Sequence, residues 1–157
     1  MHSLTKLFAI ATTTVLVSVG ATAQQSGPDD RYRIQLLLDG VPVQGSQELT
    51  QRLSGKSRAE QDAILNEPLV ELTYGASAQL SVKVTDPNGV TRTFTKGNRV
   101  RFNHFGCLTI SKDWFMTVMP SRACDAPEWP TLFVYFHDAS GRPIAYSEFQ
   151  FQLRKNQ

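Results

Sequence analysis

Apolar and polar residues alternate along most of the chain beyond residue 31, with the period of two that is typical of half-buried β-strands. Every second residue is apolar in four runs, 32–38, 80–84, 100–102 and 132–137, and the run 90–94 begins and ends with an apolar residue. Shorter apolar stretches lie at 69–74, 108–110 and 114–119. With a last long strand at 144–153, the pattern predicts eight or nine strands.

Turn-forming residues separate these runs at short intervals. Asp39-Gly40 is a strong signal for a tight hairpin turn, followed by a very short or edge strand that contains Pro42. Residues 86–89, Asp-Pro-Asn-Gly, combine a residue that presets φ with two that tolerate positive φ. We therefore predict an all-β domain, an antiparallel β-sandwich of immunoglobulin-like architecture, in preference to a closed barrel.

The last two strands carry a strong apolar pattern. In the run 132–137, one face holds Leu132, Val134 and Phe136, and the other holds Phe133, Tyr135 and His137. In the following strand, the inward positions change from Ile144 and Tyr146 to Phe149, Phe151 and Leu153. Because such a change of phase requires an extra residue in the strand, we predict a β-bulge near Ser147.

One helix interrupts the strand pattern. Ser57 and Glu60 have the spacing of a capping box, in which each residue satisfies a backbone N–H near the other. Ala59 and Ala63 then recur at helical spacing, and Pro68 follows the end. We predict one short helix at about residues 58–66, which covers one end of a sheet.

The N-terminal segment has the features of a secretory signal peptide. Lys6 supplies a positive charge, residues 7–19 form an apolar run, and Ala21-Thr22-Ala23 is a small-x-small cleavage site. The apolar run is shorter than the ~20 residues that span a bilayer. We predict that residues 1–23 are removed and that the protein is periplasmic or secreted.

The remaining chain fits one domain. Residues 24–30 are polar and contain Gly27 and Pro28, so we expect a flexible leader there. Residues 31–157 are long enough to bury a core of their own. After removal of the signal peptide we expect no transmembrane segment, because no other apolar run approaches spanning length.

Charge and cysteine content narrow the classes of partner. Removal of Lys6 leaves 15 basic and 14 acidic residues, a balance that does not favour nucleic acid as a specific partner. The two cysteines, Cys107 and Cys124, are the only ones in the chain. In an exported protein such a pair usually forms a disulfide, and we predict that bond here.

Catalytic and metal-binding motifs are absent from the sequence. It contains no nucleophile elbow, phosphate loop, dinucleotide fingerprint or H-E-x-x-H motif. His104 and His137 are not part of a ligand-spaced cluster. We do not interpret His137-Asp138 as a catalytic pair. We expect His137 to lie at the rim of the sheet and Asp138 to be a turn residue. We expect no cofactor and no metal site.

Trp129 and two neighbouring carboxylates form the first candidate site. Asp125 and Glu128 lie beside Trp129 in a loop with two prolines. Such residue types occur in glycoside hydrolysis, but sequence spacing does not fix the distance between the carboxylates. We expect Trp129 to fold onto the disulfide and plug the end of the core. The alternative is a rigid, exposed anchor for a protein or a sugar.

A basic strand forms the second candidate site. Arg99 and Arg101 are two residues apart, so we expect them on one strand face, with His104 nearby and phenylalanines interleaved. Such a strand suits an anionic polymer. The alternative is an ordinary solvated face with cationic edge protection.

Three functional classes remain. The interpretation that we favour is an exported, non-catalytic binding domain of the cell envelope, whose partner is another protein. The second is a module that binds carbohydrate or an anionic polymer, or that inhibits an enzyme, through exposed aromatic residues and arginines. The third is a hydrolase assembled from residues far apart in the sequence. A flat aromatic face would favour the second class, and a long unpaired edge strand the first.

Overall fold

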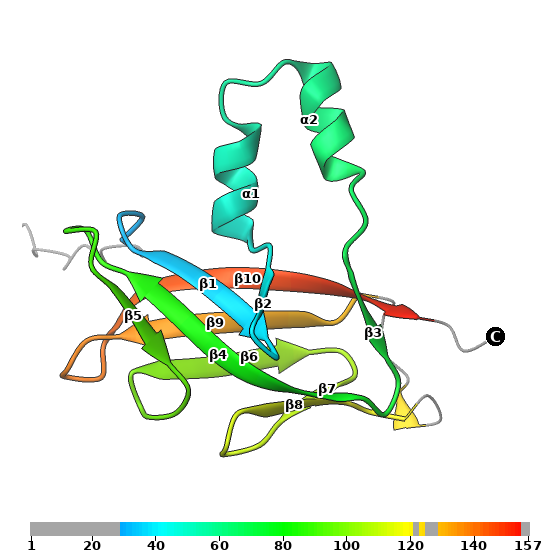
Figure 1. Ribbon diagram of the computed structural model, residues 1–157, viewed down its shortest axis with the longest axis vertical. Coiled ribbons are helices and arrows are strands. Elements are labelled where there is room, and N and C mark those ends of the chain that lie inside the picture. Colours follow the sequence, from blue (N-terminus) through cyan, green and yellow to red (C-terminus); the bar gives the residue numbers. More distant parts are fainter. Residues whose placement is uncertain (1–28, 121–122, 125–128, 155–157) are drawn as a thin grey trace, which may run out of the picture.

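The protein is a β-sandwich. The computed structural model describes residues 29–120, 123–124 and 129–154, in which ten strands form two sheets (Figure 1). The buried apolar residues of both sheets form one shared core. The prediction of an all-β sandwich with a disulfide is confirmed.

The larger sheet has six strands. Its order is β2-β1-β4-β8-β7, and β5 also pairs with β4. The strands are β1 (Arg33–Leu38), β2 (Val41–Val43), β4 (Ser77–Thr85), β5 (Thr91–Phe94), β7 (Leu108–Ile110) and β8 (Phe115–Val118). Asp39 and Gly40 join β1 to β2 with positive φ angles of 49° and 82°, as a two-residue hairpin turn of this composition requires.

The smaller sheet has four strands in the order β3-β10-β9-β6. They are β3 (Val70–Thr73), β6 (Val100–Phe105), β9 (Thr131–His137) and β10 (Pro143–Arg154). β9 is antiparallel to both of its neighbours, whereas β3 runs parallel to β10. The parallel pair departs from the purely antiparallel prediction. The long connection between these two strands, which contains β4 to β9, allows them to run in the same direction.

Two helices lie on the connection from the larger to the smaller sheet. α1 (Ser46–Leu53) and α2 (Arg58–Leu65) connect β2 to β3 and stand out together from one edge of the sandwich, at the top of Figure 1. No residue of either helix is fully buried. We call these two helices and their connecting turn the helical hairpin.

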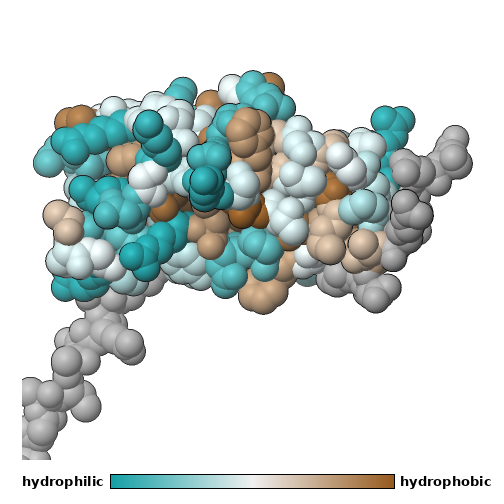
Figure 2. All heavy atoms as spheres, turned by 90° about the horizontal axis from the view of Figure 1, so that it is seen from below, coloured by the Kyte–Doolittle hydropathy of each residue, from teal (hydrophilic) through white to brown (hydrophobic). Residues whose placement is uncertain are grey.

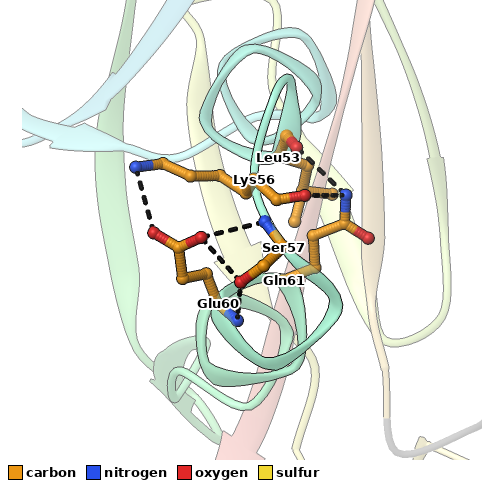
Figure 3. A network of polar contacts seen from close by, with 5 residues as sticks. All are labelled: Leu53, Lys56, Ser57, Glu60 and Gln61. Carbon is orange, nitrogen blue, oxygen red and sulfur yellow. Dashed lines mark hydrogen bonds and ion pairs between the residues drawn. The ribbon is translucent and has the colours of Figure 1, made fainter.

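α2 is the helix that the sequence predicts. The backbone N–H of Ser57 donates to the Glu60 carboxylate at 2.9 Å, and the Ser57 hydroxyl accepts from the Glu60 N–H (Figure 3). Lys56 adds an ion pair to Glu60, with 3.5 Å between the charged atoms. The Gln61 side-chain amide donates to the carbonyl oxygens of Leu53 and Lys56. The connecting turn is thus held by both helices.

α1 was not predicted, and the expectation of a single helix is wrong. Its N-cap is Gly45, which offers no side chain to the first-turn amides, so the usual N-terminal signal is missing. The spacing of Leu49 and Leu53, four residues apart on one helix face, is the signal that could have revealed it.

The irregularity in β10 lies at its beginning. The register with β9 shifts between Pro143 and Ala145, so the extra residue is Ile144. From there a single phase points inward, and its buried members are Ala145, Ser147, Phe149, Phe151 and Leu153. The prediction of a bulge near Ser147 is therefore wrong, and Tyr146 points outward rather than into the core.

A close approach of the backbone explains why Ser147 stands at an inward position. A Cβ atom on Gly45 would lie 2.6 Å from the Phe149 ring and 2.8 Å from the Ser147 hydroxyl oxygen. Only a small side chain fits beneath this contact. Because Ser147 is small and polar, the inward positions of β10 do not form an unbroken series of apolar residues in the sequence.

The disulfide and Trp114 lie at opposite ends of the hairpin formed by β7 and β8. Cys107 and Cys124 are bonded, with 5.4 Å between their Cα atoms. Trp114, between β7 and β8, is only 5% exposed and packs edge-to-face on Phe102 with ring centroids 4.9 Å apart. Its φ of 62° is unfavourable for a large side chain, so burial of the indole must compensate for the backbone strain.

The surface carries several large apolar side chains. On the side opposite the helical hairpin, hydrophobic and hydrophilic residues are interspersed (Figure 2). The exposed large apolar residues of the described chain are Val41, Leu65, Val70, Val90, Phe105, Phe115, Trp129 and Tyr146. Within the described residues, neither helix has the length and apolar character needed to cross a membrane.

Loss of the disulfide should destabilise the sandwich. We expect the double substitution Cys107→Ser with Cys124→Ser to lower the free energy of unfolding by about 2–5 kcal/mol, because the bridge restricts the unfolded chain. Denaturant titration of the variant and the oxidised wild type measures the difference. Equal midpoints and slopes would show that the bridge contributes nothing.

Candidate functional site

Four aromatic side chains form a continuous row on the solvent face of the smaller sheet. They are Phe105 from β6, Phe133 and Tyr135 from β9, and Tyr146 from β10. Successive ring centroids lie 5.8 Å, 6.5 Å and 5.9 Å apart. Phe105 is 57% exposed and Tyr146 is 42% exposed. We call this set the aromatic row.

Polar residues flank the aromatic row according to strand register. Arg101 lies directly opposite Tyr135, and Asn103 lies opposite Phe133. On the other side, Glu148 pairs with Phe133. Since residues directly opposite one another share a sheet face, the row is bordered by one cation, one amide and one carboxylate.

The structure does not bring the predicted basic residues together. The Arg99 guanidinium lies 5.0 Å from the centre of the Phe136 ring, and its Nε donates to the carbonyl oxygen of His137. Arg101 is exposed on the outer face, opposite Tyr135. The expectation that both arginines share one face is therefore wrong.

His104 also lies apart from Arg101. It pairs in register with Leu132, which is fully buried, and is itself partly buried. His104 is three positions after Arg101 in β6 and therefore points to the opposite face of the sheet, whereas Arg99 precedes β6 and lies against Phe136. They do not form a patch for an anionic polymer.

A cleft lies between the helical hairpin and the smaller sheet. Its volume is about 670 Å³, within the range of small-ligand sites. Its apolar lining includes Leu49, Ile64, Leu65, Leu69, Val70 and Trp129. Its polar lining consists of Gln44, Ser46, Asn66, Glu67, Glu148, Gln150 and Gln152. We call it the hairpin cleft.

Trp129 lines the hairpin cleft and does not plug the core. Its side chain is 50% exposed, so the expectation of a buried plug is wrong. Trp114 is the tryptophan that packs into the core. Trp129 lies two residues before Thr131, whose hydroxyl donates to the Trp129 carbonyl oxygen at 3.3 Å. Asp125 and Glu128 lie outside the described residues.

An ion pair at the hairpin cleft neutralises one of its two carboxylates. Arg52 on α1 donates to Glu67 through both terminal nitrogens and also to the Gln44 side-chain oxygen. The Arg52 guanidinium lowers the pKa of the Glu67 carboxyl and is itself held charged. The other lining carboxylate, Glu148, accepts a hydrogen bond from the Gln150 amide at 2.9 Å.

His137 and Asp138 have structural surroundings. His137 is buried, 6% exposed, and is not at the rim as expected. Asp138 is a turn residue, as predicted, because its Oδ1 accepts hydrogen bonds from the N–H groups of Ser140 and Arg142 and from the Ser140 hydroxyl. Among the described side chains, no three His, Cys, Asp or Glu residues come together to hold a metal ion.

Sequence reasoning missed the aromatic row and the hairpin cleft as sites. The alternation in β9 already places Phe133 and Tyr135 together on the outer face, and this was the available signal. Tyr146 was assigned to the inward face because the bulge was predicted near Ser147. The hairpin cleft depends on α1, which was not predicted, and on a pairing between strands far apart in the sequence.

Comparison with known proteins does not add a functional assignment. No protein-family model matches the chain. No curated protein shows significant sequence similarity to it.

The two tryptophans should respond differently to truncation. We expect Trp114→Ala to lower the free energy of unfolding by about 3–5 kcal/mol, because it leaves a cavity in the core. Trp129→Ala should cost less than about 1 kcal/mol, because half of its surface already contacts water. Denaturant melts of both variants provide the measurement. Similar losses in both would contradict the exposed position of Trp129.

The turn between β9 and β10 should show a characteristic pH response. The pKa of Asp138 is lowered from 3.8 to about 2, first by the Ser140 hydroxyl and then by the Arg142 amide. Because the folded pKa is depressed, the carboxylate stabilises the turn above its ordinary pKa, and this contribution is lost as the pH falls through about 2.

An NMR titration of the side-chain carboxyl carbon in the folded protein measures this directly. The Asp138 midpoint should be about 2 in the wild type and should move towards 3.8 in Ser140→Ala. A wild-type midpoint at 3.8 would contradict the proposed hydrogen bonding.

Proposed function

We propose that the protein is an exported, non-catalytic binding domain that contacts another protein through the aromatic row. The observation that carries this proposal is the contact of four aromatic rings on a solvent-facing sheet surface. Polar side chains at these outward positions would leave the packing of the core unchanged. Exposed apolar patches often mark interaction sites, so we infer that a partner covers these rings.

The composition of this surface supports a protein partner. Tyrosine, phenylalanine and arginine are enriched in the buried centres of protein interfaces. Tyr135 has Arg101 on one side and Tyr146 on the other. The stacked rings restrict one another, so little side-chain entropy is lost on binding. Exposed polar groups on the same face, such as Asn103, can form the rim.

The orientation of the rings also favours a protein over a flat ligand at this surface. Phe133 with Tyr135, and Tyr135 with Tyr146, are stacked with interplanar angles of 26° and 29°. Phe105 and Phe133 instead meet edge to face, with an interplanar angle of 87°, so the aromatic row is not a flat platform. Such a surface suits interdigitation with side chains better than stacking on a sugar ring.

The N-terminal segment and the disulfide, both outside the aromatic row, support export. The first 23 residues have the charge and apolar pattern of a signal peptide. The Cys107–Cys124 disulfide is compatible with an oxidising compartment such as the periplasm. We therefore place the partner in the cell envelope or outside the cell.

The proposal is tested by crosslinking and affinity capture from native envelope extract, with the exported protein as bait. Phe105→Ser combined with Tyr146→Ser should weaken capture of the partner by about 2 kcal/mol or more, roughly thirtyfold in affinity. The variant should remain folded, because both side chains are exposed.

Phe115→Ser is the matched control. Phe115 is an aromatic residue of comparable exposure, 47%, but it lies on β8 of the larger sheet. The control should capture the partner as the wild type does. The proposal fails if no protein is enriched over a blank matrix, or if both variants retain the same partner equally.

A further inference from the structure

Polar residues of β10 form the floor of the hairpin cleft, and apolar residues form part of its wall. Glu148, Gln150 and Gln152 are alternate residues of β10, so their side chains lie along one face of the strand. The apolar wall includes Leu49 and Ile64 from the two helices, with exposed Leu65 at its rim. Trp129 contributes an indole that is half exposed.

The edge of β10 beside the hairpin cleft is closed to an added strand. The Ser46 hydroxyl accepts the backbone N–H of Glu148 at 3.0 Å. Gly45 packs against the Phe149 ring so closely that a Cβ atom would collide with it. Beyond this point β3 pairs with β10 from Phe151 to Arg154. A peptide could not therefore bind here by extending the sheet, which is the usual mode for an extended chain.

The charge of the lining disfavours an anionic ligand. None of the described residues that line the hairpin cleft is Lys, Arg or His. Of its two carboxylates, Glu67 is paired with Arg52, and Glu148 carries an unbalanced negative charge beside the Gln150 amide. An anion would meet repulsion without a compensating cation. The lining therefore favours a neutral or cationic occupant.

Four side-chain amides in the lining favour a ligand with many hydroxyl groups. Gln44, Asn66, Gln150 and Gln152 each combine a carbonyl acceptor with an NH₂ donor. Within the described chain, no hydrogen bond engages the side-chain amides of Asn66 and Gln152. Sugar hydroxyls are both donors and acceptors and so match amides in either orientation. The Trp129 ring offers an apolar surface for the C–H face of a sugar.

We propose that the hairpin cleft binds a neutral oligosaccharide, with Trp129 as the stacking residue and the amides of Gln150 and Gln152 as hydrogen-bonding groups. This site goes beyond the protein-binding function of the aromatic row. The two surfaces adjoin through Glu148 on β10 but use different side chains, so either proposal can fail alone.

The test is calorimetric titration of the exported protein with neutral tetrasaccharides built from glucose, mannose, xylose or N-acetylglucosamine, and with an oligogalacturonate as the anionic comparison. We expect at least one neutral sugar to bind and to change the tryptophan fluorescence. Trp129→Ala should weaken binding about tenfold or more and abolish the fluorescence change, because Trp114 is buried away from the ligand. Gln152→Leu should also weaken binding without destabilising the fold.

Two further variants separate this proposal from the previous one. Phe105→Ser with Tyr146→Ser should bind the sugar normally, and Trp129→Ala should still capture the protein partner. The oligosaccharide proposal is overturned if no neutral sugar in the panel binds at millimolar concentration, if the anionic sugar is preferred, or if Trp129→Ala binds as tightly as the wild type.

Discussion

Burial of the inner faces of β9 and β10 against the larger sheet is the interaction on which the rest of the structure depends. Leu132, Phe149 and Phe151 are completely buried there, and each such side chain contributes about 1.5–3 kcal/mol through its removal from water. Because side chains alternate along a strand, this burial also directs Tyr135 and Tyr146 into solvent. The core thereby determines the geometry of the aromatic row.

The second constraint is the close approach of Gly45 to β10. It places the start of α1 against Ser147 and Phe149, and this contact anchors a helical hairpin that buries no residue completely. Internal hydrogen bonds around Ser57 and Glu60 then maintain its shape. A hairpin fixed at its base and exposed along its length leaves a cleft beneath it.

The two proposed binding surfaces follow from these two constraints. The aromatic row lies over β6, β9 and β10, the three antiparallel strands of the smaller sheet, and their pairing sets the spacing of its rings. The hairpin cleft is bounded by segments that are far apart in the sequence, and Trp129 enters it from the chain between the disulfide and β9. A protein partner and a sugar would therefore contact neighbouring but distinct parts of one sheet.

The sequence alone determined the strands, the capped helix and the disulfide, because these depend on local alternation, on the Ser57–Glu60 spacing and on a single pair of cysteines. It did not determine the phase of β10, since the pairing with β9 turns Ser147 inward and the close approach of Gly45 leaves room there for a small side chain. Nor could it distinguish the two tryptophans: Trp114 is buried and Trp129 is exposed through contacts with residues far along the chain. The sequence also did not show that Arg99 and Arg101 have different surroundings, because the contact of Arg99 with the Phe136 ring joins residues far apart in the chain. Local periodicity sets which residues can share a face, whereas the pairing of distant strands decides which faces are covered and which remain free to bind.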